Sequence, residues 1–452
     1  MNSTDPSSEP LLRVSRSPAL RGKVCVPGDK SISHRALLFG ALADGPVEIG
    51  GLGLGGDNAS TMVALRALGV PIQQAGTDAR VEGVGLDGLH EAACALDCGN
   101  SGTTMRLFCG LLAGRPFVST LTGDASLSRR PMARVATPLR RMGAVIDGRQ
   151  EAVRPDDMFP PLTVRGGALQ GIEYDLPVAS AQIKTALILA GLQARGRTAI
   201  GEPGLSRDHS ERMLRFLGAP VSAEPARRRV VVDPTGWNGR LRAGPVSVPG
   251  DLSSAAFLLV AALIVPGSDV TVENVGLNPT RTGVLDALLA MGADLEAEVT
   301  GQAMGEPVGK VRARWTERRL RGITVAGELA LRSIDEIPAL AVAAARADGT
   351  TDFRDLRELR VKESDRIACI SRELRRAGVT VREAPDGLSV EGTTGGVFQG
   401  GRVRPDGDHR IAMACAILGL VAAEATEVPS RDIATSFPSF AHLLQVLGAP
   451  AQ

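Results

Sequence analysis

The sequence predicts an α/β (α+β) protein of two domains, each made of three copies of one repeat. A phrase of the form Leu-x-x-Leu/Met-Gly-Ala/Val recurs at intervals of about 75 residues through the whole chain. A uniformly apolar segment of helical length precedes each copy of the phrase. Residues 26–43 also resemble residues 248–264, half the chain away. This last similarity separates the six repeats into two sets of three.

The recurring phrase is typical of the end of an amphipathic helix with a glycine just beyond its last turn. A strand-like segment, such as AVID at 144–147, follows it. The glycines are Gly69, Gly143, Gly218, Gly292, Gly378 and Gly448. Such phrases also occur by chance in α/β proteins, but here both the spacing and the order recur.

The apolar segments lie at 33–43, 102–113, 180–192, 252–264, 335–347 and 408–420. A helix that is apolar on all faces is a buried helix. Each repeat is therefore predicted to run as strand, buried helix, strand, amphipathic helix and strands.

The composition of the chain argues against two classes of protein, namely general nucleic-acid-binding proteins and membrane-spanning proteins. The chain has 3% aromatic residues and a net charge of +1, which argues against a general nucleic-acid partner. The longest apolar run, 255–265, is too short to span a membrane. No signal-peptide pattern is visible, so we expect a cytoplasmic protein. The polar start of the chain, to about residue 12, is predicted to be a disordered tail.

The cysteines are scattered, which is typical of reduced thiols. His90, Cys94 and Cys98 could suggest a zinc cluster, but a fourth ligand is missing and the spacing matches no standard site. We expect neither a metal nor a cofactor.

The first repeat confines its polar residues to the start of its buried helix. Lys30, Ser31 and Arg35 follow a turn at 27–29, and only apolar residues come after them. The first N–H groups of a helix lack partners and carry partial positive charge, so this end favours phosphate or carboxylate. Lysine is rare in this arginine-rich chain, and a lysine can also transfer a proton.

The next two repeats also begin their buried helices with polar residues. In the second, Asn100 precedes Gly102, whose missing Cβ lets a ligand approach the backbone, and Arg130 follows in a loop. The third begins with Ser180, Ala181 and Gln182. Later in the third repeat, Ser206 and Arg207 are expected to open a second helix, and His209 is interpreted as a capping or surface residue.

The last three repeats differ in charge. The fourth keeps serines but has no cation at its helix start, so it is interpreted as structural, and Arg281 receives no role. The fifth places Asp335 and Glu336 at its helix start. It continues with Lys362, Glu363 and Arg366, of which the two cations would share a face if this segment is helical. The sixth begins with Asp408, His409 and Arg410.

If the repeats are related by symmetry, their helix starts can face one cleft between two domains. The cations gathered there would bind a polyanionic small substrate or two substrates, and the few carboxylates would transfer protons. A Walker A motif, a dinucleotide fingerprint and a Gly-x-Ser-x-Gly elbow are all missing.

The chain resembles the 3-phosphoshikimate 1-carboxyvinyltransferase (5-enolpyruvylshikimate-3-phosphate synthase) family from about residue 15 onward. The resemblance rests on PGDKSISHR (27–35), GNSGTTMR (99–106), GDASLSRRPM (123–132), VASAQIKTAL (178–187), SRDH (206–209), SIDEIPALAVAAA (333–345), LRVKESDRI (359–367), DHRIAM (408–413) and ATSFP (434–438). It implies an inside-out α/β barrel of six βαβαββ repeats, with helices buried and sheets outside. Domain one would comprise residues 1–28 and 249–452, domain two would comprise 29–248, and the active site would lie in the interdomain cleft.

The resemblance also implies a reaction in the shikimate pathway of chorismate and aromatic amino acid biosynthesis. The enolpyruvyl group of phosphoenolpyruvate passes to the 5-hydroxyl of 3-phosphoshikimate, and phosphate leaves, by addition and elimination without a covalent enzyme adduct. Asp335 would accept the hydroxyl proton with help from Lys362, and Glu363 would give a proton to the methylene carbon.

By the same resemblance, the catalytic residues are Asp335, Glu363 and Lys30. The 3-phosphoshikimate contacts are Lys30, Ser31, Arg35, Ser180, Ala181, Gln182, Ser206, Arg207, Asp335 and Lys362. The phosphoenolpyruvate contacts are Lys30, Asn100, Gly102, Arg130, Gln182, Arg366 and Arg410. Glyphosate, which resembles phosphoenolpyruvate, should bind beside Gly102, and we expect a monomer.

One position departs from the family pattern, because many members carry lysine where this chain has Thr435. One phosphate contact must then come from elsewhere or be absent. The alternative activity is transfer to a UDP-amino sugar (UDP-N-acetylglucosamine), but those enzymes have asparagine in place of Ser31 and usually a cysteine in the loop corresponding to 121–132. RNA-end cyclisation or RNA binding on a related fold would need a basic, aromatic surface. A non-catalytic relative would be expected to lose Asp335 or Glu363.

Overall fold

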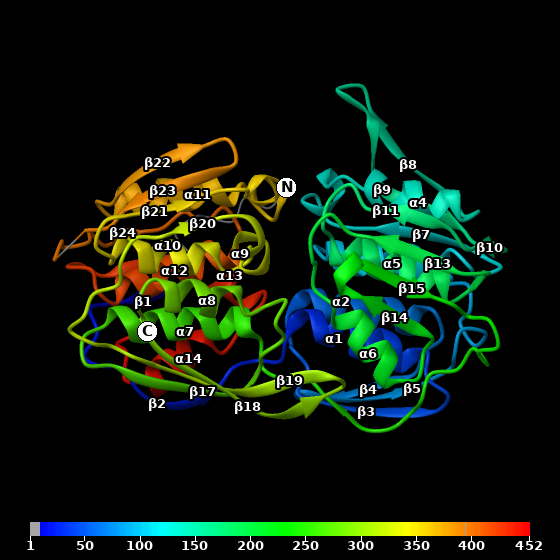
Figure 1. The fold of residues 1–452 in the computed structure, drawn as a ribbon, viewed down its shortest axis with the longest axis horizontal. Helices are drawn as coiled ribbons and strands as arrows, with labels where there is room; N and C mark the ends of the chain where they lie inside the picture. The colour runs from blue at the N-terminus through cyan, green and yellow to red at the C-terminus, as the bar shows by residue number, and fades with distance from the viewer. Residues whose placement is uncertain (1–9, 394) are drawn as a thin grey trace. The chain divides into compact units, whose positions relative to one another are not determined.

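The computed structural model describes residues 10–393 and 395–452. These residues divide into two compact units, each with its own hydrophobic core (Figure 1). Unit 1 contains the residues up to Pro27, Pro249–Gly301 and Pro307–Gln452, and unit 2 contains Gly28–Val248 and Gln302–Glu306. Gly28 therefore belongs with the following helix, because it packs so tightly that a Cβ there would lie 1.9 Å from the Gly51 carbonyl oxygen.

Unit 2 begins with the first buried helix of the chain. Its helices are α1 (Lys30–Ala41), α2 (Gly56–Ala67), α3 (Gly102–Leu112), α4 (Ala133–Arg141), α5 (Ala181–Gly191) and α6 (His209–Phe216), with 3-10 turns η2 (Leu127–Arg129) and η3 (Pro225–Arg227). Its strands are β3 (Pro46–Gly50), β4 (Ile72–Ala75), β5 (Asp78–Glu82), β6 (Leu96–Asp97), β7 (Val118–Thr122), β8 (Val145–Glu151), β9 (Arg154–Arg165), β10 (Leu169–Gln170), β11 (Glu173–Asp175), β12 (Ala194–Arg195), β13 (Thr198–Gly201), β14 (Val221–Glu224), β15 (Arg229–Val232) and β16 (Val246–Ser247).

Unit 1 combines both ends of the chain. Its helices are α7 (Leu252–Ile264), α8 (Gly283–Ala290), α9 (Gly327–Arg332), α10 (Ile337–Ala345), α11 (Arg366–Arg376), α12 (His409–Gly419), α13 (Ser430–Ala434) and α14 (Phe440–Val446), with the 3-10 turn η4 (Arg357–Val361). Its strands are β1 (Leu11–Val14), β2 (Arg21–Cys25), β17 (Asp269–Gly276), β18 (Asp294–Ala303), β19 (Glu306–Arg314), β20 (Thr324–Val325), β21 (Thr350–Phe353), β22 (Thr380–Ala384), β23 (Gly387–Glu391), β24 (Gly401–Arg402) and β25 (Thr426–Pro429).

The repeat is visible in the strand order of the sheets. Among the described residues, five sheets have four strands each: β16-β3-β5-β4, β6-β7-β9-β8, β11-β13-β15-β14, β2-β17-β19-β18 and β20-β21-β23-β22. In each, the first strand is parallel to the second, and the second is antiparallel to the third. These five sheets therefore share one topology.

The sixth sheet is completed by the start of the chain. β24 runs parallel to β25, and β25 pairs antiparallel with β1, in the register Leu11 with Pro429. The predicted disordered tail is therefore wrong for Leu11 and Leu12, because their backbone groups pair with this strand. The rest of that predicted tail, up to residue 9, lies outside the described residues.

The helices follow the predicted pattern. α1, α3, α5, α7, α10 and α12 coincide with the apolar segments, and nearly all of their residues are buried. The glycines of the recurring phrase all have positive φ, from 86° at Gly218 to 111° at Gly143, just after an amphipathic helix. This is the left-handed conformation that a glycine cap adopts without steric cost.

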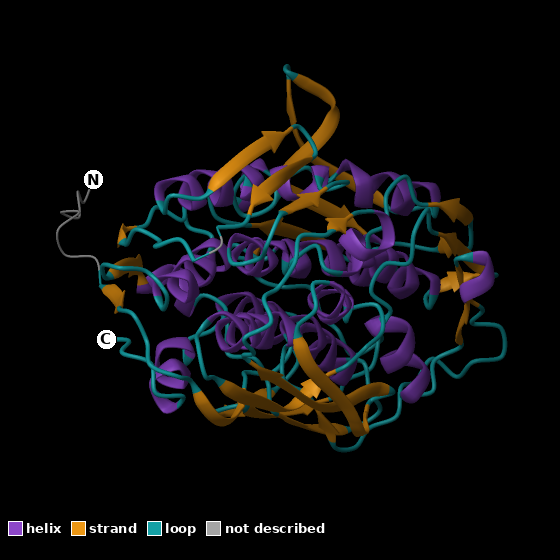
Figure 2. Ribbon diagram, turned by 60° about the vertical axis from the view of Figure 1, so that its left-hand side comes forward, coloured by secondary structure: helices purple, strands orange, loops and turns teal. Residues whose placement is uncertain are grey.

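Figure 2 shows that both units contain helices as well as strands, and some neighbours along the chain are of the same type, such as α13 and α14. Within the residues that the structure describes, every helix is too short or too polar to cross a bilayer.

Candidate functional site

The start of α1 is built as the sequence predicts. The Asp29 carboxylate accepts a hydrogen bond of 2.9 Å from the Ile32 backbone N–H and caps the helix. The Lys30 ammonium lies 2.9 Å from the Asp57 carboxylate, which belongs to the first turn of α2. The Asp57 backbone carbonyl in turn accepts a bond of 3.5 Å from the Thr104 hydroxyl in α3. Asp57 therefore connects the starts of two buried helices of unit 2.

Arg35 is buried, and its guanidinium donates hydrogen bonds to neutral oxygens. Its Nε donates to the Ser210 hydroxyl at 2.7 Å, its Nη2 to the Thr185 hydroxyl at 2.9 Å and its Nη1 to the Ser31 carbonyl at 2.9 Å. Burial lowers the pKa of this guanidinium to about 10, although the charges of Glu211 and Asp29 partly oppose the shift. Unit 2 thus contains a fixed cation surrounded by neutral oxygens, which is a suitable partner for an anion.

The predicted residues at the start of α3 lie together. Arg130 donates to the Asn100 side-chain oxygen at 2.6 Å, and Gln182 donates to the Thr103 hydroxyl at 2.8 Å. Arg106, which the sequence did not single out, donates to the Gln182 side-chain oxygen at 2.9 Å. Two guanidinium groups therefore face this helix start.

Gly102 begins α3 between these two cations. A Cβ placed on Gly102 would lie 2.7 Å from Arg106 Nη1 and 3.4 Å from Arg130 Nη1. The missing side chain therefore leaves room for the Arg106 guanidinium beside the backbone of Gly102.

The third repeat confirms one predicted helix start and corrects another. Ser180 caps α5 by accepting a hydrogen bond from the Ile183 N–H at 3.4 Å, and Ala181 is the first residue of that helix. Ser206 and Arg207 do not open a helix, because α6 begins only at His209. Instead, the Ser206 hydroxyl donates a hydrogen bond to the Glu202 carboxylate, which fixes it in the preceding loop.

A buried ion cluster lies behind Ser206. Lys184, in α5, is 1% exposed and lies 2.8 Å from the Glu202 carboxylate and 2.7 Å from that of Glu211. Burial by itself would lower the pKa of Lys184, but the two carboxylates outweigh it and raise the pKa. The local sequence pattern does not reveal this cluster. The signal that could have indicated it is a lysine inside a uniformly apolar helix, which requires a buried acid as its partner.

His209 is neither a surface residue nor a helix cap. Its side chain is 1% exposed, and Nδ1 lies 2.9 Å from the Glu306 carboxylate within unit 2. The interpretation as a surface or capping residue is wrong because His209 pairs with Glu306 at the start of β19, a partner that the local sequence does not reveal.

Unit 1 surrounds a cation with carboxylates. The Arg366 guanidinium donates to Asp335 at 3.0 Å, to Glu363 at 2.5 Å and to Asp408 at 2.8 Å. Burial alone would lower the pKa of Arg366, but the charges of Asp408, Glu363 and Asp335 raise it above its ordinary value. The predicted acids Asp335 and Glu363 therefore both form hydrogen bonds with the predicted cation Arg366.

Two more predicted cations meet Asp335. Lys362 Nζ lies 3.7 Å from its carboxylate, and Arg410 Nη1 donates to its backbone carbonyl at 3.0 Å. Lys362 does not share a helix with Arg366, because it follows η4 and α11 begins only at Arg366. The two cations nevertheless meet at the same carboxylate oxygen, Asp335 Oδ1.

The fourth repeat does contain a cation. Arg281 is 3% exposed and donates to the Asp251 carboxylate at 3.0 Å and to the Ser253 hydroxyl at 2.7 Å, at the start of α7. Because it comes from the next loop, the local motif did not reveal it. Thr435, where many family members have lysine, ends α13 and donates its hydroxyl to the Asp432 carbonyl at 2.6 Å.

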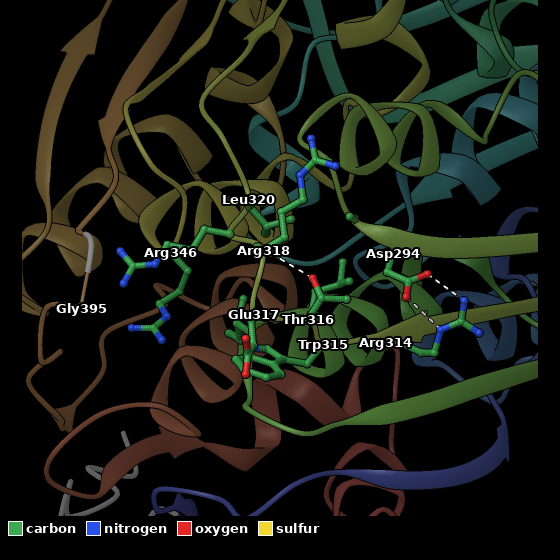
Figure 3. Close-up of a pocket in the computed structure, with 14 residues that line it drawn as sticks. Asp294, Arg314, Trp315, Thr316, Glu317, Arg318, Leu320, Arg346 and Gly395 are labelled. Carbon is green, nitrogen blue, oxygen red and sulfur yellow. Dashed lines mark hydrogen bonds and ion pairs between the residues drawn. The ribbon is translucent and has the colours of Figure 1, made fainter.

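A cavity of about 310 Å³ lies elsewhere in unit 1 (Figure 3). It is lined by Trp315, Arg318, Arg346 and the Asp294–Arg314 ion pair, whose shortest contact is 2.8 Å. None of the predicted site residues lines it, so it is distinct from the residue clusters described above.

Comparisons with known proteins agree with the resemblance. The family model "EPSP synthase (3-phosphoshikimate 1-carboxyvinyltransferase)" matches residues 14–444. A 3-phosphoshikimate 1-carboxyvinyltransferase from Synechococcus sp. (strain JA-3-3Ab) is 52% identical, over 99% of each chain.

Solved structures show the same fold. An EPSP synthase from Acinetobacter baumannii has a TM-score of 0.86 and 42% identity, covering 98% of this chain and 99% of its own. The enolpyruvyl transferase NikO from Streptomyces tendae has a TM-score of 0.75 with 20% identity, covering 98% of each chain, which shows a shared fold alone. The fold is therefore that of the enolpyruvyl transferases, with mixed helices and sheets. From its sequence and its fold, this enzyme belongs to the EPSP synthase (3-phosphoshikimate 1-carboxyvinyltransferase) family.

Proposed function

We propose that this enzyme transfers the enolpyruvyl group of phosphoenolpyruvate to the 5-hydroxyl of 3-phosphoshikimate and releases phosphate. The observation that carries the proposal is the surrounding of Asp335. Its carboxylate contacts Lys362 and Arg366, and its backbone carbonyl accepts a hydrogen bond from Arg410. Fixed cations around a carboxylate suit a reaction in which a proton moves beside bound anions.

The groups of unit 2 are proposed to hold the phosphorylated acceptor. Arg35 offers a buried positive charge whose partners are hydroxyls and a carbonyl. Lys30 and Ser31 lie at the start of the same helix, where the partial positive charge of the helix dipole favours a phosphate. Ser180, Ala181, Gln182, Ser206 and Arg207 would complete the contacts with the phosphate and the ring.

Phosphoenolpyruvate is proposed to contact groups of both units. Unit 2 would supply Lys30, Gln182, Arg130 with Asn100, and the backbone at Gly102, and unit 1 would supply Arg366 and Arg410. A guanidinium has five N–H donors, and Arg366 uses three of them on carboxylates. Two N–H groups of Arg366 therefore remain for a substrate oxygen.

In the proposed addition, Asp335 takes the proton of the attacking 5-hydroxyl, and Lys362 stabilises the resulting charge. Glu363 delivers a proton to the methylene carbon, and its contact with Arg366 holds the carboxyl group in place. In the elimination, the methyl group returns a proton to the Glu363 carboxylate, phosphate leaves with the proton taken from the 5-hydroxyl, and the double bond is restored. Lys30, which is bonded to Asp57, is proposed to assist proton movement near the leaving phosphate.

We retain the inside-out barrel as the proposed architecture of each unit, supported by buried helices that combine with a sheet in each repeat. The cytoplasm, the monomeric state and the binding of glyphosate beside Gly102 remain predictions.

The test is a measurement of phosphate release by the purified enzyme. We expect release with phosphoenolpyruvate and 3-phosphoshikimate together, and background release when either is omitted. UDP-N-acetylglucosamine in place of 3-phosphoshikimate should also give background release. Equal or faster release with the UDP-sugar, or background release with the proposed pair, would overturn the proposal.

A further inference from the structure

The start of α7 is connected to the proposed site by buried charges. Arg281 Nη2 donates to the Asp251 carboxylate at 3.0 Å and to the Ser253 hydroxyl at 2.7 Å. The Ser253 hydroxyl donates to Glu336 Oε1, and the Ser253 N–H donates to the Asp251 carboxylate at 2.8 Å. Ser253 therefore links a buried cation of the fourth repeat to a buried acid of the fifth.

Glu336 lies between two cations. Its Oε1 is 3.8 Å from Arg281 Nη2 and 3.9 Å from Arg410 Nη1, and its side chain is 1% exposed. Arg410 is 6% exposed and also donates to the Asp335 backbone carbonyl. The Glu336 carboxylate is therefore close to Arg410, the proposed contact of phosphoenolpyruvate, and adjacent in the chain to Asp335, the proposed base.

This arrangement is a weak source of stability. Among the described residues, Glu336 Oε2 is buried without a hydrogen-bond partner. An uncompensated buried oxygen costs free energy, and replacing buried ion pairs by apolar residues is often neutral or stabilising. The buried charge of Glu336 is therefore better explained by the orientation of neighbouring groups than by a gain in the free energy of unfolding.

We propose that Glu336, supported by Ser253 and Arg281, is a positioning residue for Arg410 and for the turn that carries Asp335. This inference rests on the proposed function. Glu336 fixes the direction of the Arg410 guanidinium by charge, and the adjacent peptide fixes Asp335. None of these supporting groups touches substrate in the proposal, so they act only through Arg410 and Asp335.

The expected effect is selective. Arg410 is assigned to phosphoenolpyruvate, so Glu336→Gln should raise KM for phosphoenolpyruvate by about tenfold or more, as expected for a residue coupled within one network. KM for 3-phosphoshikimate should stay within about twofold, because unit 2 supplies most of the proposed contacts of that substrate.

The experiment compares Glu336→Gln, Arg281→Gln and the double variant, with Glu298→Gln as the control. Glu298 forms an exposed ion pair of 2.9 Å with Lys310 in the same unit, so its loss should leave both KM values unchanged. Each single variant leaves a buried charge with fewer partners and should lower Tm. The double variant removes both charges, so Tm should recover towards that of the parent while KM for phosphoenolpyruvate stays high.

Recovery of KM together with Tm in the double variant would show a merely structural role and overturn the inference. An unchanged KM for phosphoenolpyruvate in Glu336→Gln, or an equal rise of both KM values, would also overturn it. If Glu336→Gln does not fold, the KM values of the double variant decide the question, because that variant loses one buried negative and one buried positive charge and keeps the same net charge. Failure of the parent enzyme to release phosphate would instead reject the proposed function itself.

Discussion

Two buried arginines, Arg35 in unit 2 and Arg366 in unit 1, are held in opposite ways. Arg35 donates to hydroxyls and a carbonyl, and burial lowers its pKa to about 10. Arg366 donates to three carboxylates, whose charges raise its pKa despite burial. A guanidinium among neutral oxygens keeps its charge for an incoming anion, whereas one among carboxylates orients those carboxylates. From this difference we propose that unit 2 mainly binds the phosphorylated acceptor and that unit 1 carries the main proton-transfer groups.

The largest expected effect tests the unit 1 side of this comparison. Asp335→Asn removes the proposed base, so kcat should fall about 10²–10⁴-fold while the fold persists. Phosphate release gives kcat, and thermal unfolding reports the fold. Asp294→Asn, which breaks an ion pair with Arg314 away from the site, should leave kcat unchanged. Parental turnover in Asp335→Asn would remove this residue from the mechanism.

A substitution of Lys184 tests whether the two buried acids of unit 2 need a cation for stability. Lys184→Met leaves Glu202 and Glu211 without their cation, so the free energy of unfolding should fall by about 3–5 kcal/mol. Urea denaturation measures this loss. Lys310→Met, at an exposed pair with Glu298, should cost less than about 1 kcal/mol. Equal losses in the two variants would mean that the buried acids do not need Lys184.

Arg35→Gln separates binding from chemistry. The variant loses the buried charge but keeps a polar group, so KM for 3-phosphoshikimate should rise about 10–100-fold, with a smaller change in kcat. Steady-state kinetics with each substrate varied gives both values. Arg80→Gln, at an exposed pair with Glu48, is the matched control. A loss confined to kcat would contradict the role of unit 2 as the side that binds the acceptor.

His34, a buried residue of α1, should make the stability of the folded protein depend on pH. Burial lowers its pKa to about 3, while Nδ1 lies 2.7 Å from the Thr61 hydroxyl. Below about pH 6.5 the unfolded chain binds a proton that the folded chain refuses, so stability is complete above that pH and falls with acid. Between pH 7 and pH 5 the loss should be about 2 kcal/mol.

Urea denaturation at the two pH values measures this slope. His34→Gln should flatten it, whereas His90→Gln, at an exposed histidine, should leave it as it is. An unchanged slope in His34→Gln would assign the acid sensitivity to other groups.

Gly102→Ala gives the smallest expected effect. The new methyl group would lie 2.7 Å from Arg106 Nη1, so that flexible side chain must shift. We expect glyphosate inhibition to weaken by about tenfold or more, and KM for phosphoenolpyruvate to rise less. Inhibition curves measured at several phosphoenolpyruvate concentrations check this. Coinciding curves for the two forms would contradict the placement of the inhibitor beside Gly102.

The sequence predicted the features that depend on local pattern. The apolar segments became buried helices, and glycines such as Gly143 adopted the left-handed conformation. It also singled out Asp335, Lys362 and Arg366, which the structure brings together.

The missed features depend on partners distant in the sequence. Lys184 meets Glu211, and Arg281 meets Glu336, across different elements of the fold. A helix pattern does not reveal such pairs, because either member alone resembles an ordinary charged residue. Ser206 was misplaced for a similar reason, since its hydroxyl is bound by Glu202 rather than by a helix start.

The pairing of both chain ends in one sheet orders events during synthesis on the ribosome. The Ser430 hydroxyl bonds the Pro10 carbonyl, 420 positions away, and the Arg13 and Gln452 backbones exchange two hydrogen bonds. β1 must therefore wait for β25 and for the residues near Gln452, and β2 must wait for β17, while most of the inserted segment is already complete. Unit 2 can fold first and unit 1 only afterwards, so a stalled or truncated product leaves β1 and β2 exposed to proteases and to aggregation.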